Sequence, residues 1–565
     1  MTSEQFNTKD EFTKQSQAFV QWLTESRGYT ISPKVAVHDY RSQGQGRGLI
    51  AVADIAEGED LFTIPRDRVI AIDSDTQGNG ALVQRVPELA DGTLDDWSAL
   101  ILYLMYHASK GEAFKPYFDV IPAQFSTPMF WDDGEAEKFL QGSTLVGKIG
   151  KTEAEAGFRE NILPVVEKYK DTVFDGVDVS VDAFHRVGSL IMSYSFDVDR
   201  VKAGSNEEKD SEKAKEEEQE PADEKEDDEE PGDEEEHEEL IIGEEFSDDE
   251  DDDGPVKAMV PLADTLNAHS QLCNAHLEQE DDGSLVMRAT AAIPAGSQIY
   301  NTYGDFPNSD LLRRYGYTEL GGTASDLVEI TVNDLVDAAV AHAPAPANKF
   351  AEPATRESTL QLVQLLADWE DGVMELVDDS YDVERTTAGV PNPELLSLIN
   401  FLVLALVRSK DLKAFRRTLK RNGGADEEKL TKKLVKTLVK HAATGKLTFR
   451  EAVPVWRAVF EARIGKYPQA VQDECTRRAA AKSASETDSI TQVVVGTREA
   501  MATEVLVGEV EILRLALAWV DTALADAPSV DEFEFPSASA SAASAGSKRK
   551  LGHNNKSQTK KSKRS

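Results

Sequence analysis

The sequence predicts a mixed α+β fold, in which a β-rich part is interrupted by helices and followed by an all-α domain. Three observations support this. Apolar runs of strand length begin near residue 35, helical periodicity takes over from Leu94, and strand patterns return after residue 255. Helical patterns then dominate residues 325–525. The order β, α, β, α without regular alternation indicates an insertion within one β-rich domain, followed by a second domain.

Composition excludes several classes of protein. With 565 residues the chain can form two or three domains, each with a core. The longest apolar run, residues 395–407, is too short to span a bilayer and predicts a buried helix. The first residues are polar and acidic, unlike a secretory signal. Cys273 and Cys475 are the only cysteines, so we expect a soluble intracellular protein without disulfides.

The net charge of −42 is concentrated in one segment. Residues 205–254 hold 29 acidic and four basic side chains and have no apolar period, which predicts a disordered acidic segment. Residues 548–564 carry eight Lys or Arg and no acid. This basic tail, within a predicted disordered stretch 526–565, is either a nuclear address or simply solvated.

The first elements are predicted in order along the chain. Residues 1–34 are expected to form an N-terminal helical segment. Strands in residues 48–55 and 59–65, separated by "AEG", predict a hairpin-like pair. A helical insertion is expected over about 67–255. Its first helical pattern is "LDDWSALILYLMYHASKG" (94–111), which has apolar residues at helical spacing and ends on glycine.

Further helical patterns and a second set of strands complete the prediction. The insertion continues through helices in 156–170 and 180–196, and strand and turn patterns return over 284–304. The last domain shows helical patterns at 356–378, 394–421, 427–443 and 499–525. Residues 410–440 hold 11 basic and four acidic side chains, which fits either a solvated helix face or a surface for acidic or phosphate groups.

The stretch "DTLNAHSQLCNAH" places His269, Cys273 and His276 within eight positions. Zinc accepts such side chains, but no Cys-x2-Cys partner exists and the spacing matches no usual ligand pair. We therefore predict that no metal is bound.

Three separated stretches gain meaning when they are taken together. Gly44, Gly46 and Gly48 precede a strand, where a bare backbone can approach a ligand closely. Asn267 lies in the histidine-containing stretch. The segment "IYNTYGDFPNSDLLRRYGY" supplies Tyr303, Tyr315 and Tyr317.

The order and content of these stretches resemble the SET-domain protein-lysine methyltransferases. Within that family the chain looks most like the group of the Rubisco large-subunit methyltransferase and the fungal ribosomal-protein lysine methyltransferases. "FKPYFDVIPAQFSTPMFW" (114–131) and the helical C-terminal pattern add to the resemblance, which covers residues 15–525. It implies a knotted SET domain over 35–320 and a helical substrate-binding domain over 325–525.

The resemblance also implies a cofactor, S-adenosyl-L-methionine (SAM), and assigns residues to it. The family's Asn-His pair corresponds here to Asn267 and Ala268, so a histidine contact is lost although backbone contacts can remain. Tyr194 stands where the family often has arginine. The implied catalytic residue is Tyr303, which also contacts the cofactor. The implied cofactor-binding residues are Gly46, Arg47, Gly48, Tyr194, Asn267, Ala268, Tyr303 and Tyr317, and the implied substrate-binding residues are Phe196, Asp264 and Tyr315.

The expected activity is methyl transfer to a lysine of a basic protein. A free lysine has a pKa near 10.4, so an apolar aromatic channel is needed to favour its neutral form. A ribosomal protein is the favoured substrate, with a histone as an open alternative, and neither a metal nor direct nucleic-acid binding is required. A non-catalytic acidic binding protein on a SET fold is the other alternative, but Tyr303 and Asn267 favour the enzyme. We expect a nuclear protein, with the cytoplasm also open.

Overall fold

The computed structural model describes residues 9–72, 80–200, 255–342, 380–386, 449–484, 493–494 and 496–526, with scattered positions between 355 and 403. The chain forms two compact units. The first combines residues 1–327 with 466–511, and the second combines 328–465 with 512–565. The acidic segment, the basic stretch 410–440, the predicted helix 427–443 and the basic tail lie outside the described residues. No described helix has the length and apolar character needed to cross a bilayer.

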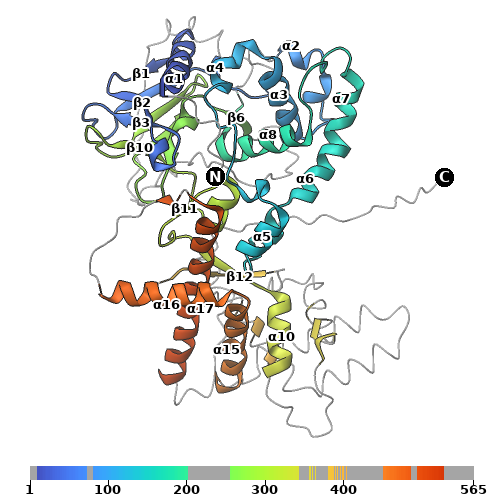
Figure 1. Cartoon of the computed structure of the whole chain (residues 1–565), viewed down its shortest axis with the longest axis vertical. Helices are drawn as coiled ribbons and strands as arrows, with labels where there is room; N and C mark the ends of the chain where they lie inside the picture. The colour runs from blue at the N-terminus through green and yellow to red at the C-terminus, as the bar shows by residue number, and fades with distance from the viewer. Residues whose placement is uncertain are drawn as a thin grey trace, which may run out of the picture. The chain divides into compact units, whose positions relative to one another are not determined.

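Two four-stranded sheets build the β-rich part of the first unit (Figure 1). One has the order β1-β4-β9-β8 and the other the order β2-β3-β10-β7. All strand pairs in these sheets are antiparallel except β10 with β7, which are parallel. The strands are β1 (Thr30–Ile31), β2 (Val35–Asp39), β3 (Arg47–Ala51), β4 (Asp60–Ile64), β7 (Asn267–Ala268), β8 (Ala275–Gln279), β9 (Leu285–Ala289) and β10 (Gln298–Asn301).

The hairpin-like pair predicted for residues 48–55 and 59–65 is wrong, although both strands exist as β3 and β4. β3 pairs with β2 and β10, whereas β4 pairs with β1 and β9 in the other sheet. The connection between them contains Ile55, which is buried and bridges Ile293. The connection therefore carries the chain from one sheet to the other instead of folding it back.

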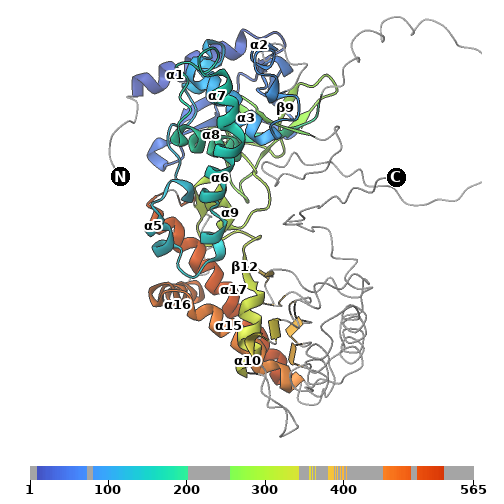
Figure 2. The same cartoon turned by 90° about the vertical axis from the view of Figure 1, so that its right-hand side faces the viewer.

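The helical insertion packs as a cluster around α3 and α8 (Figure 2). The side chain of Asp95 caps α3 by accepting a hydrogen bond from the Ser98 amide, and Gly111 follows the helix. The 180–196 pattern gives α8, but its last two residues begin β5 instead. The elements of this part are α1 (Lys9–Thr24), α2 (Gly80–Val83), α3 (Asp96–Lys110), α4 (Lys115–Phe118), α5 (Asp133–Phe139), α6 (Lys151–Gly157), α7 (Leu163–Tyr169), α8 (Val181–Tyr194), β5 (Ser195–Val198) and β6 (Val256–Met259).

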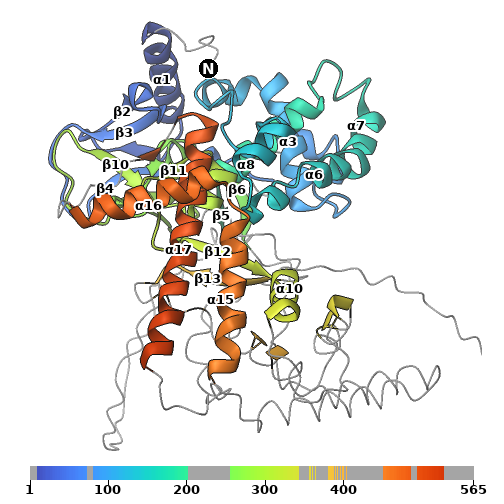
Figure 3. The same ribbon diagram turned by 60° about the horizontal axis from the view of Figure 1, so that its bottom comes forward.

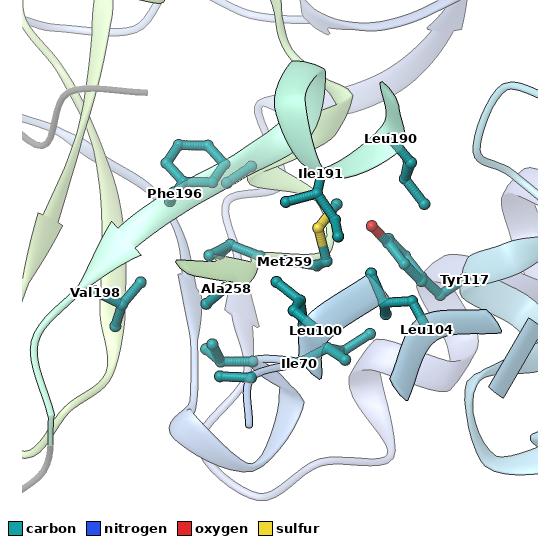
Figure 4. Packing of buried hydrophobic residues seen from close by; sticks show 14 of the residues in the cluster. Ile70, Leu100, Leu104, Tyr117, Leu190, Ile191, Phe196, Val198, Ala258 and Met259 are labelled. Atoms are coloured by element: carbon teal, nitrogen blue, oxygen red, sulfur yellow. The ribbon is translucent and has the colours of Figure 1, made fainter. Parts of the chain in front are cut away.

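The insertion and the strands share one apolar core. Figure 4 shows Ile70, Leu100, Ile191 and Met259 converging from segments far apart in the sequence. Each of these side chains is at most 3% exposed. The core therefore fixes β5 and β6 against α3 and α8, and β5 carries Phe196.

The rest of the first unit contains α9 (Asn308–Asp310), β11 (Thr318–Glu319), α16 (Gln469–Ala484), β14 (Val493–Val494) and the start of α17 (Arg498–Asp526). Glu509 of α17 is buried and accepts hydrogen bonds from the hydroxyls of Ser143 and Tyr467, both at 2.7 Å. These bonds compensate the burial of its carboxylate.

The second unit includes β12 (Leu327–Thr331), α10 (Val332–His342), β13 (Ser380–Glu384), α15 (Phe449–Gly465) and the end of α17. Figure 3 shows α10 beside α15. Trp456 of α15 stacks on Trp519, with ring centroids 5.7 Å apart. The described C-terminal region is thus mainly helical, as predicted, but β12, β13 and β14 interrupt it.

The pairing of β5 with β6 yields a prediction about the acidic segment. The two strands are antiparallel with Val198 opposite Val256, so the strands that flank the segment are paired with each other. A short Asn-Gly turn in place of residues 201–254 should therefore close the pair without strain. We expect the melting temperature to change little. A fall of more than about 4 °C, the upper end of what ~1 kcal/mol produces in a domain of 150–250 residues, would show that the segment stabilises the fold.

Candidate active site

A glycine-rich strand forms one wall of the candidate site. Gly46 has φ +73°, which favours glycine, and no atom lies within 4 Å of the position that its Cβ would take. At Gly48, a Cβ would lie 2.7 Å from the Asn267 amide nitrogen and 2.8 Å from the Tyr40 ring. Both glycines are therefore required, the first for its backbone angle and the second for space.

Asn267 joins this strand to the second predicted motif. Its side-chain amide donates a hydrogen bond to the Arg47 carbonyl at 3.2 Å. Its strand β7 is the terminal strand of its sheet and runs parallel to β10, with Ala268 opposite Asn301. The structure thus brings Arg47, Gly48, Asn267 and Ala268 together, and it gives Asn267 a clamping contact that the sequence did not predict.

The side chain of Arg47 serves a different purpose from its backbone. Its guanidinium donates to the Val120 carbonyl at 2.8 Å and to the side chains of Gln15 and Ser16, and it lies over the Phe12 ring. Burial lowers its pKa to about 10, so it stays charged at neutral pH. The arginine therefore anchors α1 to β3, while its backbone is the part predicted to face the cofactor.

Three tyrosines meet beyond the end of β10. The rings of Tyr303 and Tyr315 stack at 4.2 Å with an interplanar angle of 18°. The Tyr317 ring lies 6.4 Å from both. Burial raises the pKa of all three well above the ordinary value, so each keeps its hydroxyl proton at neutral pH. The Tyr303 hydroxyl donates to the Leu266 carbonyl at 3.3 Å.

Asp264 lies in the turn just before Asn267. Its carboxylate accepts a hydrogen bond from the Tyr117 hydroxyl at 2.8 Å. Burial raises its pKa to about 7, and its charge contributes to the raised pKa of Tyr194 and Tyr303. The predicted substrate residue is therefore a half-buried carboxyl close to tyrosine hydroxyls.

Tyr194 and Phe196 approach the site from the insertion. Tyr194 ends α8 and faces the Phe125 ring at 6.4 Å. Phe196 is 2% exposed and lies in the apolar core (Figure 4). Tyr194, Tyr303 and Tyr315 pack against the same core. Phe196 thus belongs to the core that supports the three tyrosine rings.

The glycine wall has features that fit a polar cofactor. The Gln298 amide nitrogen is buried and has no hydrogen-bond partner among the described residues. It lies 3.0 Å from the position that a Gly48 Cβ would take. An unpaired donor beside a bare backbone suits a ligand with acceptor groups, such as the carboxylate of SAM.

The side chains of His269 and Cys273 contact other groups of the protein. His269 is buried, and its Nδ1 accepts a hydrogen bond from the Gln271 amide at 3.1 Å and lies 3.7 Å from the buried Glu319 carboxylate. The Cys273 thiol lies 3.6 Å from the Ala275 carbonyl. Within the described part of the chain, no cluster of three or more His, Cys, Asp or Glu side chains is arranged to hold a metal.

Sequence reasoning missed the residues that support the site. Tyr117, Gln298 and Glu319 belong to stretches that gave no sign of a shared location, since Tyr117 is 147 positions from its partner Asp264. Only the resemblance of residues 114–131 to one family group hinted that Tyr117 matters.

The comparisons with known proteins agree with this geometry. A family model of the SET domain matches residues 46–304. Ribosomal lysine N-methyltransferase 4 from Saccharomyces cerevisiae is 28% identical over 530 residues, which are 91% of this chain and 93% of that protein. N-lysine methyltransferase SETD6 from Homo sapiens is 28% identical over 48% of each chain.

Solved structures show the same fold. The structure of Rubisco LSMT bound to AdoMet matches with a TM-score of 0.53 and 16% identity, over 92% of this chain and 94% of that one. A crystal structure of the LSMT SET domain with lysine and AdoHcy matches with a TM-score of 0.53 and 16% identity, over 91% and 92%. The predicted SET fold with a helical C-terminal region is therefore confirmed.

One relative is similar enough to decide the family. Ribosomal lysine N-methyltransferase 4 from Schizosaccharomyces pombe is 32% identical over 338 residues, which are 56% of this chain and 70% of that protein. Together with the match to the SET-domain model, this similarity shows that the chain belongs to the SET-domain family of protein-lysine methyltransferases.

Proposed function

We propose that this chain transfers methyl groups from SAM to a lysine of a large-subunit ribosomal protein. Membership of the family supports the reaction and the cofactor. The substrate class rests on the names of the two yeast relatives, one of which aligns with 91% of this chain. The observation that carries the proposal is the tyrosine cluster around Tyr303, placed beside a glycine wall with an unpaired donor.

Tyr303 is the proposed catalytic residue because its hydroxyl has a defined orientation. Its proton is directed at the Leu266 carbonyl, so the lone pairs on its oxygen can accept an N–H of the substrate amine. Its raised pKa means that it acts as a neutral hydroxyl and not as a base at neutral pH. Tyr303 can therefore orient the amine so that the lone pair on nitrogen points toward the methyl group.

The neighbouring residues prepare the amine and hold the cofactor. Tyr315 and Phe196 give an apolar wall, which disfavours the ammonium form of lysine. SAM supplies an activated methyl group on its sulfonium. We assign its methionine end to the backbone of Gly46, Arg47 and Gly48, and its adenine to Asn267, Ala268 and Tyr317.

The substrate proposal predicts a specific labelling pattern. Purified protein with methyl-labelled SAM should label a large-subunit ribosomal protein from cells lacking the enzyme, and histones should remain unlabelled. Mass spectrometry of the labelled band identifies the lysine. Labelling of histones alone would overturn the ribosomal assignment, and no labelling of either would point to another substrate.

Two variants test the role of Tyr303 within the same assay. Tyr303→Phe keeps the ring that stacks on Tyr315 and removes the hydroxyl, so folding and SAM affinity should persist. We expect turnover to fall on the order of 100-fold, roughly 2.7 kcal/mol of barrier. Tyr315→Phe is the matched control from the same stacked pair and should have a milder effect or change the number of methyl groups added. Equal turnover of Tyr303→Phe and the native protein would refute the assignment.

We also propose that the basic tail directs the protein to the nucleus. Its eight Lys or Arg residues between 548 and 564 occur without any acidic residue, as in a nuclear address. A fluorescent fusion truncated after Pro536 should lose its nuclear accumulation, while the full-length fusion keeps it. Nuclear accumulation of the truncated chain would show that the tail is not needed.

A further inference from the structure

A strained turn lies at the centre of the candidate site. Leu262 has φ +83° and is the only non-glycine residue with a positive φ among the described residues. A bulky side chain in this conformation persists only when the surrounding structure holds it there. The turn runs from Leu262 through Ala263–Thr265 to Leu266, and Leu262 and Leu266 are at most 1% exposed.

One end of the turn controls the groups that the reaction uses. The Leu266 carbonyl accepts the Tyr303 hydroxyl, and the next residue, Asn267, clamps the Arg47 carbonyl. A shift of this turn would therefore move the catalytic hydroxyl and the glycine wall together.

The turn is held from the helical insertion by one polar contact. Tyr117 of α4 is fully buried, and its hydroxyl donates to the Asp264 carboxylate at 2.8 Å. Figure 4 shows Tyr117 among the apolar side chains of the core, close to Leu104 and Leu190. Because its ring is fixed by this packing, the Tyr117 hydroxyl is a rigid anchor for the turn.

Asp264 can change its charge near neutral pH. Burial is the main cause of its raised pKa of about 7, and the hydrogen bonds from Tyr117 and Thr265 partly oppose it. The groups that face it are the hydroxyls of Tyr117, Tyr194 and Tyr303, which stay protonated in this range. A hydrogen bond to the carboxylate form is shorter and stronger than one to the neutral acid.

We propose that Tyr117 and Asp264 form a latch that holds the strained turn and so positions the Tyr303 hydroxyl for methyl transfer. Both are positioning residues, and the kinetic effect expected of the latch rests on the proposed function. The ionised form of Asp264 is the working form, because it binds Tyr117 most strongly. The kcat should therefore rise with pH through the titration of Asp264, near pH 7.

The same carboxyl should cost stability when it ionises. Its pKa is raised from 3.8 to about 7 on folding, so the folded protein binds more protons than the unfolded chain between these values. Stability from this group is therefore highest at low pH and is lost as the pH rises toward 7. Asp264→Asn keeps the shape and an acceptor for Tyr117 but cannot ionise. Its melting temperature relative to the native protein should be higher at pH 8 than at pH 5.

The kinetic test uses Tyr117→Phe and Asp264→Asn in the full-length protein. Tyr117→Phe removes only the hydroxyl, and we expect kcat to fall about 10-fold, equivalent to ~1.36 kcal/mol, with SAM affinity by calorimetry largely kept. Its rise in kcat should also move to higher pH, because a hydrogen bond that lowers the pKa of Asp264 is gone. Asp264→Asn should lower kcat and abolish the rise attributed to Asp264.

Tyr169→Phe is the matched control. Tyr169 lies in the same insertion, and its hydroxyl also bonds a buried carboxylate, Glu88, at 3.1 Å. It should lose a comparable amount of stability while keeping the native kcat and pH profile.

The possible results separate the latch from the proposed function. Unchanged kcat and pH profile in both Tyr117→Phe and Asp264→Asn would overturn the latch, as would an equal loss of kcat in Tyr169→Phe. If the native protein methylated nothing, the proposed function would fail. The melting temperatures of Asp264→Asn at the two pH values would then still decide whether Asp264 is the titrating group, and no difference between them would overturn that part of the latch.

Discussion

The hydrogen bond from the Asn267 amide to the Arg47 carbonyl is the contact on which the candidate site depends. It joins two stretches that are 220 positions apart. Asn267 lies so close to Gly48 that no side chain fits at position 48. Ala268, the residue after Asn267, lies beside Asn301 because β7 pairs in parallel with β10. Tyr303 follows Asn301 by two positions in the sequence. The glycine wall and the tyrosine cluster therefore both contact the consecutive residues Leu266 and Asn267.

The chemistry follows from the burial of the tyrosine hydroxyls, which fixes their protonation state. The three tyrosines keep their protons because burial disfavours the phenolate, so the site offers oriented hydroxyls and aromatic faces. Such surroundings favour a neutral amine over an ammonium ion. Burial also raises the pKa of the Asp264 carboxyl, to about 7. Ionisation of this carboxyl lowers the free energy of unfolding, while its hydrogen bond to Tyr117 is proposed to position the Tyr303 hydroxyl. Functional sites often carry strain of this kind at a cost in stability.

The sequence predicted the strands and helices that depend on local pattern. The apolar periodicity from Leu94 gave α3, and the runs around residues 50 and 62 gave β3 and β4. It mispredicted their pairing, because a bridge between Ile55 and Ile293 redirects the connection, and such a contact leaves no local pattern. The predicted site residues came from motif resemblance, and their roles stay predictions.

The supporting residues could not be predicted for the same reason. Tyr117 packs like any core aromatic, and only the fold brings its hydroxyl to Asp264. Likewise, the side chain of Arg47 gave no hint that it would turn away toward α1 while its carbonyl accepts Asn267. Local sequence gives the residue type at a site, whereas the direction in which the side chain points is set by tertiary packing.

Gly48 must lack a side chain so that Asn267 can bond the Arg47 carbonyl beside the proposed cofactor site. A Gly48→Ala substitution would place a methyl group 2.7 Å from the Asn267 amide and force that hydrogen bond apart. Overpacking of this kind costs about 1–3 kcal/mol, so the SAM dissociation constant measured by calorimetry should rise on the order of 10-fold or more. Gly157→Ala in α6, where no atom lies within 4 Å of the added methyl, should bind SAM as the native protein does. Native SAM affinity in a folded Gly48→Ala protein would show that cofactor binding does not depend on the contact between Asn267 and Arg47.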